Sequence, residues 1–94
     1  MYIISYDIEN DRIRRKIAKV LENYGKRVQY SVFECNLTSN HFEKLYAKIS
    51  VLMQEEEKGS IRIYNICRSC EKRIVVIGVE SDALMEIRED TIVI

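Results

Sequence analysis

The chain has no proline, no internal repeat and no low-complexity stretch that would act as a linker between domains. Its 94 residues are 47 % apolar. A chain of this size buries about 60 to 65 % of its unfolded surface. We therefore expect one domain with a modest core, to which a second copy of the chain would add stability.

A net charge is also lacking, because 15 basic and 15 acidic side chains cancel. This excludes a protein that coats nucleic acid through a large positive field. Basic residues nevertheless gather at residues 12–16 and at Lys26 and Arg27, while residues 55–57 form an acidic block. Any contact with phosphate must therefore be local.

Disulfides, secretion signals and membrane spans are missing from the sequence as well. Three cysteines do not make a disulfide framework, and the first residues do not combine a charged start with an apolar centre. The longest apolar stretch covers only residues 74–79, whereas a bilayer span needs about 18 to 20 residues. We therefore expect a cytoplasmic protein that does not contact a membrane.

Two amphipathic helices are predicted from apolar residues at helical spacing. The first has Asn10 or Asp11 as its cap and ends at Gly25 in a left-handed conformation. The second follows residues 38–40, and the spacing from Asn40 to Glu43 fits a capping box. The apolar faces are Ile13, Ile17, Val20, Leu21 and Tyr24 in the first helix, and Phe42, Leu45, Tyr46, Ile49, Leu52 and Met53 in the second.

The remaining apolar segments are rich in β-branched and aromatic residues, which predicts strands. They cover residues 2–8, 26–35, 60–67, 73–78 and 91–94. The segment 26–35 is either one strand or a hairpin bent near residues 29–31. With the hairpin, the fold is α+β, a ferredoxin-like βαββαβ sandwich with both helices on one face of an antiparallel sheet. We assign residues 1–79 to this domain and residues 80–94 to a tail whose edge strand pairs with a partner protomer.

Asp7 lies where the first apolar strand ends and a basic helix begins. Carboxylates bind hard divalent metals together with phosphate and water, and arginine grips phosphate oxygens in a bidentate way. One aspartate is too few for tight metal binding, but a symmetric dimer would bring two copies of Asp7 together. The alternative is that Asp7 begins a turn and the arginines form a solvated helix face.

Cys67 and Cys70 have the spacing of half a zinc knuckle, but the chain offers only Cys35 and His41 to complete four ligands. A thioredoxin-like redox pair would open a helix after a strand, whereas we expect this pair in a loop between two strands. Packing and turn formation are therefore expected for the cysteines, and a surface cap for His41.

Four aromatic residues are candidates for stacking on nucleic-acid bases: Tyr6, Tyr30, Phe33 and Tyr64. Aromatic residues in alternating strands more often pack in the core or on a sheet face. For Phe33, a nucleic-acid or partner contact is kept beside this core role.

Three segments together resemble the CRISPR-associated protein 2 family, the small nuclease-like subunit of the CRISPR spacer-acquisition machinery. They are Tyr6-Asp7-Ile8 with Arg14 on the following helix, the string over residues 25–35, and residues 61–64. The most specific of them is the run R-V-Q-Y-S-V-F-E of residues 27–34 at its distance from Asp7. The likeness covers essentially the whole chain.

The resemblance implies a homodimer in which the C-terminal strand augments the other protomer's sheet. It places the catalytic, metal-binding carboxylate at Asp7, with Mg²⁺ as the ion or Mn²⁺ in its place. Lys16 occupies a position where relatives often carry arginine, which keeps the charge and loses the bidentate contact. The resemblance implies phosphate contacts by Arg14, Lys16 and Arg27, and with the aromatic candidates Tyr6 and Phe33 these are the residues predicted to bind nucleic acid.

Two functions follow from the resemblance. One is a metal-dependent endonuclease that cuts single-stranded RNA or double-stranded DNA and acts in spacer acquisition with the CRISPR integrase. The other is a non-catalytic dimeric scaffold that seats DNA through phosphate contacts and docks the integrase. A protein-binding module or toxin-like regulator on the same fold is a third class.

Overall fold

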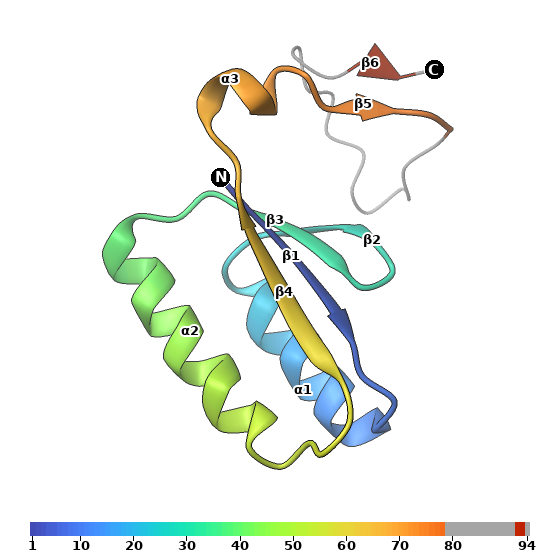
Figure 1. Cartoon of the computed structure of the whole chain (residues 1–94), viewed down its shortest axis with the longest axis vertical. Helices are drawn as coiled ribbons and strands as arrows, with labels where there is room; N and C mark the ends of the chain where they lie inside the picture. Colours follow the sequence, from blue (N-terminus) through green and yellow to red (C-terminus); the bar gives the residue numbers. More distant parts are fainter. Residues whose placement is uncertain (79–91, 94) are drawn as a thin grey trace.

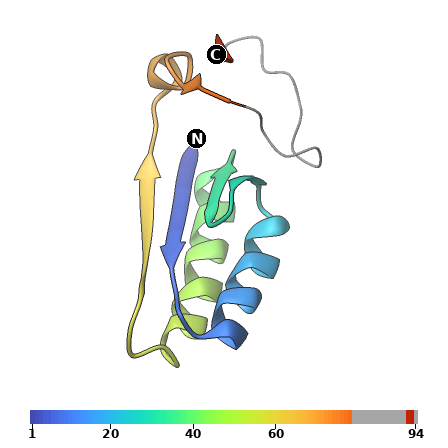
Figure 2. The same cartoon turned by 90° about the vertical axis from the view of Figure 1, so that its right-hand side faces the viewer.

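A computed structural model describes residues 1–78 and 92–93 of the chain. The elements are β1 (Tyr2–Asp7), α1 (Asp11–Glu22), β2 (Lys26–Gln29), β3 (Val32–Cys35), α2 (Ser39–Met53), β4 (Ser60–Asn65), α3 (Arg68–Glu71), β5 (Val75–Val76) and β6 (Ile92–Val93). The first four strands form an antiparallel sheet in the order β2-β3-β1-β4. Both long helices cover one face of this sheet (Figures 1 and 2). The predicted ferredoxin-like βαββαβ fold is confirmed.

The segment 26–35 is a hairpin, which settles the alternative that the sequence left open. Tyr30 and Ser31 form the turn, and the register of β2 against β3 shifts between Arg27 and Gln29. The Tyr6 amide donates to the Ser31 carbonyl at 3.1 Å. This contact holds the turn against β1, so tertiary hydrogen bonding stabilises a bend that has no glycine or asparagine.

Helix α1 follows its predicted pattern. The Asn10 Oδ1 atom accepts a hydrogen bond from the Ile13 amide at 3.0 Å and caps the first turn. Ile13, Ile17 and Leu21 are fully buried. The apolar stripe therefore faces the sheet, and the basic side chains of α1 are directed away from the core.

Gly25 has a different role from the predicted one. Among the described residues only Gly59 and Gly78 have a positive φ, so Gly25 does not end α1 in a left-handed conformation. A Cβ atom at Gly25 would lie 2.3 Å from the Glu34 carbonyl oxygen and 2.4 Å from the Cys35 Sγ. Glycine is needed there because the chain passes directly against β3.

Helix α2 begins two residues earlier than the capping-box spacing predicted. Thr38, not Asn40, is the cap, and its hydroxyl accepts from the His41 amide at 3.3 Å. Leu45 and Ile49 are buried as expected, but Tyr46 is 56 % exposed, so its assignment to the apolar face was wrong. The stripe of α2 is narrower than predicted because only one side of this helix meets α1 and the sheet.

The core lies between the sheet and the two long helices. Alternate residues of β1 and β3 supply it, with Ile4 and Tyr6 from β1 and Phe33 and Cys35 from β3. Because side chains alternate along a strand, Ile3, Ser5 and Asp7 are directed to the opposite face. No helix of the described part of the chain covers that face (Figure 2).

Beyond β4 the chain departs from the predictions. The strand expected over residues 73–78 is only Val75–Val76, and it pairs in parallel with Ile92–Val93 of the same chain instead of joining the four-stranded sheet. Pairing of the tail with a partner protomer stays a prediction. Residues 79–91 and 94, which include the proposed boundary at residue 80, lie outside the described residues.

The helices within residues 1–78 are too short or too polar for a bilayer crossing.

Candidate active site and nucleic-acid interface

Asp7 is the last residue of β1 and pairs with Ser60 at the start of β4. Its side chain is exposed, and no described residue forms a hydrogen bond or ion pair with its carboxylate. The neighbouring Gly59 has φ +122°, and a Cβ there would lie 2.7 Å from the Asp7 carbonyl oxygen. Glycine thus lets the chain pass close beside the Asp7 backbone just before β4 begins. The Asp7 carboxylate at the end of β1 stays exposed.

The Asp7 carboxylate forms no ion pair with the arginines of α1 among the described residues, although Arg14 donates to the carbonyl of the next residue, Ile8, at 3.1 Å. Tyr6 is directed to the helix side of the sheet, and alternation along the strand sends Asp7 to the uncovered face. Two features therefore lie on opposite faces of the sheet, and their joint role in one site stays a prediction. One is the free Asp7 carboxylate, and the other is a basic hollow.

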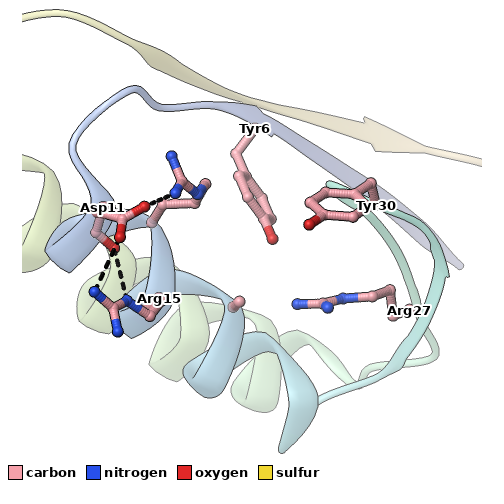
Figure 3. A pocket seen from close by; sticks show the side chains of 7 residues that line it. Tyr6, Asp11, Arg15, Arg27 and Tyr30 are labelled. Atoms are coloured by element: carbon pink, nitrogen blue, oxygen red, sulfur yellow. Dashed lines mark hydrogen bonds and ion pairs between the residues drawn. The ribbon is translucent and has the colours of Figure 1, made fainter.

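The basic hollow lies between α1 and the β2–β3 hairpin and has a volume of about 380 Å³. Figure 3 shows Tyr6, Arg27 and Tyr30 reaching into it from the strand side and Asp11 and Arg15 from α1. We call it the arginine hollow, and its lining residues are Tyr6, Asp11, Arg14, Arg15, Ala18, Arg27 and Tyr30. The lining carries three arginines and only one carboxylate, so its net positive charge favours binding of an anion.

Ion pairs within α1 determine which of these arginines is available. Asp11 pairs with Arg14 and, at 3.0 Å, with Arg15. Arg14 also donates to the carbonyls of Ile8 at 3.1 Å and Glu9 at 3.2 Å. The guanidinium of Arg14 therefore braces the turn after β1, which leaves less of it for a ligand.

Arg27 is held mainly by packing. Its guanidinium carbon lies 5.2 Å from the centre of the Phe33 ring, and its Nη2 atom is 3.9 Å from Glu22. The Nε atom is buried and has no hydrogen-bond partner among the described residues. Arg27 thus projects across the hollow with donors to spare, which favours a phosphate contact.

Phe33 is fully buried, with 0 % of its surface exposed. A ring in this position cannot stack on a base, so the predicted nucleic-acid contact is corrected to a core role in which Phe33 supports Arg27. Tyr6 is only 6 % exposed but lines the hollow. Lys16 is exposed on α1 and is not one of the lining residues. Contacts of Tyr6, Arg14, Lys16 and Arg27 with nucleic acid stay predictions.

Arg15 was not predicted from the sequence as a site residue, and Tyr30 was named only as a candidate for base stacking. Tyr30 is 89 % exposed at the tip of the hairpin, beside Arg27. In the sequence, the feature that could have indicated Tyr30 is a tyrosine in a turn without glycine or asparagine. Arg15 lies one helical turn after Asp11, a spacing that would have indicated the ion pair.

The residues fit a divalent metal only in part. In the described ranges, no group of three or more histidine, cysteine, aspartate or glutamate side chains is close enough to hold an ion. Asp7 offers a hard oxygen donor that no other described group occupies. Magnesium is commonly held by one or two carboxylates with substrate phosphates and water, so Asp7 fits as one ligand of a shared site.

The cysteines do not form a zinc site in the part of the chain that is described. Cys35 is buried, and burial raises the pKa of its thiol to about 11. Cys67 and Cys70 are exposed and lie on α3, the short helix after β4. The loop expected between two strands was therefore wrong, because the CxxC pair opens a helix after a strand.

Known proteins resemble this chain in sequence. Residues 1–74 match the model of the family described as CRISPR associated protein Cas2. A relative from Chloroflexus aurantiacus, named CRISPR-associated endoribonuclease Cas2 1, is 49 % identical over 77 residues, which cover 82 % of this chain and 83 % of the relative.

Solved structures agree with the sequence match. Streptococcus pyogenes Cas2 at pH 6.5 superposes with a TM-score of 0.72 at 29 % identity, covering 82 % of this chain and 98 % of that one. A chain of a partial Cas6-RT-Cas1–Cas2 complex has a TM-score of 0.65 at 36 % identity, covering 73 % of this chain and 80 % of that one. By its sheet order, its Asp7 strand end and these matches, the chain belongs to the CRISPR-associated Cas2 family.

Proposed function

We propose that this chain is a metal-dependent endonuclease of CRISPR spacer acquisition that cuts single-stranded RNA or double-stranded DNA. The observation that carries the proposal is the exposed Asp7 carboxylate, which has no partner among the described residues. The name of the relative with 49 % identity, an endoribonuclease, supports nuclease activity. A cytoplasmic location belongs to the same proposal.

The metal in this proposal is Mg²⁺, with Mn²⁺ as a substitute, held by Asp7. When bound, such an ion supplies an activated water, neutralises charge at phosphorus and assists the leaving oxygen. Asp7 must hold the ion with its carboxylate ionised and accessible. The hydrogen-bonded ladder between β1 and β4 positions it for that role.

A homodimer completes the site, because one carboxylate per chain is too few for tight binding. On the uncovered face of the sheet, Val32 pairs with Ser5, two residues from Asp7, and Ile3 pairs with Tyr64 farther along the strands. Pairing two such faces about a two-fold axis would bury these apolar groups and bring both Asp7 carboxylates to one place. Sedimentation of the intact chain tests this part of the proposal.

In this proposal the arginine hollow binds phosphates of the polynucleotide backbone. Because Asp7 and the hollow face opposite sides of the sheet, the phosphates bound by Arg15 and Arg27 and the phosphate that is cut belong to different nucleotides. The contacts are charge-assisted and carry no base readout. Binding that depends little on sequence is the expected result.

A scaffold without catalysis is the second candidate function. The position of Asp7 on the face opposite the arginine hollow favours it, because the cations of the hollow then do not assist a metal at Asp7. The solved Cas6-RT-Cas1–Cas2 complex supports an integrase partner for either function. In the scaffold, the hollow seats a DNA duplex and Asp7 has no chemical role.

The deciding experiment measures cleavage of labelled single-stranded RNA and double-stranded DNA with Mg²⁺, Mn²⁺ or EDTA, and duplex binding in the same samples. Cutting that EDTA abolishes and metal restores supports the nuclease and identifies its substrate. Equal residual cutting under all conditions, with tight duplex binding, supports the scaffold.

Arg27→Ala should weaken binding of unrelated sequences about equally, by roughly tenfold, because one charge-assisted phosphate contact is lost. The slope of log affinity against log salt should also fall by about 0.7 for single strands or 0.9 for duplex. Titrations at several salt concentrations measure both quantities. Arg73→Ala, which removes an exposed arginine outside the hollow, is the matched control. An unchanged slope in Arg27→Ala would remove this residue from the interface.

A further inference from the structure

Cys67 and Cys70 lie together on the short helix α3, outside the arginine hollow and away from Asp7. Cys67 is the residue at the N-terminal boundary of α3, and Cys70 lies within the helix three positions later. Residues at this spacing are neighbours on one helical face. Both thiols are exposed, so reagents in solution can reach them.

The two thiols are chemically different. The Cys67 Sγ lies 3.2 Å from the Ser69 hydroxyl and also interacts with the Cys70 thiol. These hydrogen bonds, with that of Ser69 the largest, lower the pKa of Cys67 to about 7. The interaction with Cys67 raises the pKa of Cys70. About half of the Cys67 thiol is therefore ionised at pH 7 while its neighbour stays protonated, which is the arrangement of an attacking and a resolving cysteine.

We propose that Cys67 and Cys70 are a redox-active dithiol that closes reversibly into an intramolecular disulfide by exchange with a low-molecular-weight disulfide. The Cys67 thiolate attacks one sulfur of that disulfide, forms a mixed disulfide and releases the first small thiol. The Cys70 thiol then loses its proton, attacks the Cys67 sulfur and releases the second small thiol. The protein loses two electrons and two protons, and the small disulfide is reduced to two thiols.

The surroundings of α3 allow this closure without disturbing the sheet. The Ile66 amide donates to the Met1 carbonyl at 2.7 Å, which fixes the chain just before the pair. The Glu71 amide donates to the Cys67 carbonyl at 2.9 Å and holds the turn closed. The third cysteine, Cys35, is buried in the core and takes no part.

The test exposes the full chain to mixtures of reduced and oxidised glutathione, quenches with acid, alkylates the denatured protein and measures its mass. Reduced protein should take up one alkyl group on each of its three cysteines. In oxidising mixtures we expect only Cys35 to be alkylated. Trypsin cuts after Arg68, so the disulfide should join two peptides that a reductant separates.

Variants identify the role of each thiol. Cys70→Ser should accumulate glutathione on Cys67, because the resolving thiol is gone. Cys67→Ser should react at Cys70 roughly fivefold more slowly at pH 7, because that thiol is mostly protonated. Ser69→Ala should slow the first step while the disulfide still forms.

Three results would overturn the proposal. The first is full alkylation of Cys67 and Cys70 in every mixture. The second is a disulfide between two chains in place of the internal one. The third is protection of both thiols that a chelator removes and a reductant does not, which would indicate a bound soft metal.

Discussion

Asp7→Asn is expected to lower metal-dependent cleavage by about 10³-fold or more, because the loss of an ionised ligand removes several kcal/mol of metal assistance to the reaction. Binding of the same RNA or duplex should change by less than about twofold, because Asp7 and the arginine hollow lie on opposite faces of the sheet. Single-turnover cleavage and binding of labelled substrates, measured in the same samples, check both values.

Glu43→Gln is the matched control for Asp7→Asn. It removes one negative charge from an exposed position on α2 and should leave cleavage unchanged. Equal cleavage by wild type and Asp7→Asn would contradict a catalytic Asp7 and favour the scaffold. A loss of both cleavage and binding would instead place Asp7 at the substrate interface or point to a disrupted dimer, which sedimentation separates.

Phe33→Ala is expected to lower the free energy of unfolding by about 3 to 5 kcal/mol, because it leaves a cavity in the core. The ring lies between the sheet and α1 and stacks near Tyr6, with 6.3 Å between the ring centres. The Arg27 guanidinium packs over the face of this ring. Urea denaturation followed by circular dichroism measures the loss of stability.

Tyr30→Ala is the control for Phe33→Ala, because Tyr30 is an aromatic residue of the same hairpin with its side chain in solvent. Its effect on the free energy of unfolding should stay within about 0.5 kcal/mol. If Phe33→Ala kept the urea midpoint of wild type but lost nucleic-acid binding, the core role of Phe33 would be refuted. The direct nucleic-acid contact predicted from the sequence for Phe33 would then be restored.

Local patterns predicted most of the secondary structure, and particular residues show why. The spacing of Ile13, Ile17 and Leu21 admits only a helix with one buried side, and Asn10 is the preferred type of residue for its cap. Alternation in β1 is a local rule of the same kind, and it places Ile4 and Tyr6 on the face opposite Ser5 and Asp7. These signals operate over a few residues, so they are visible without the tertiary structure.

The misassigned features depend on contacts between distant segments. Gly25 looked like a helix terminator, but its reason is the close passage of β3 ten residues later. Phe33 looked like a candidate for stacking, but α1 and Arg27 cover it. The CxxC pair looked like part of a loop, yet hydrogen bonds from Ile66 to the start of β1 and within α3 place it on a helix.

The fold class, the family and the carboxylate at the end of the first strand could all be inferred from local properties of the chain, namely hydrophobic period, capping and motif spacing. Which groups come together depends instead on the packing of distant segments. Both long helices cover one face of the sheet, so the arginine hollow forms on that face while Asp7 lies on the other. Packing of the hairpin against α1 instead brings Arg27 and Tyr30 to Arg15, because the sheet order places segments distant in sequence beside one another.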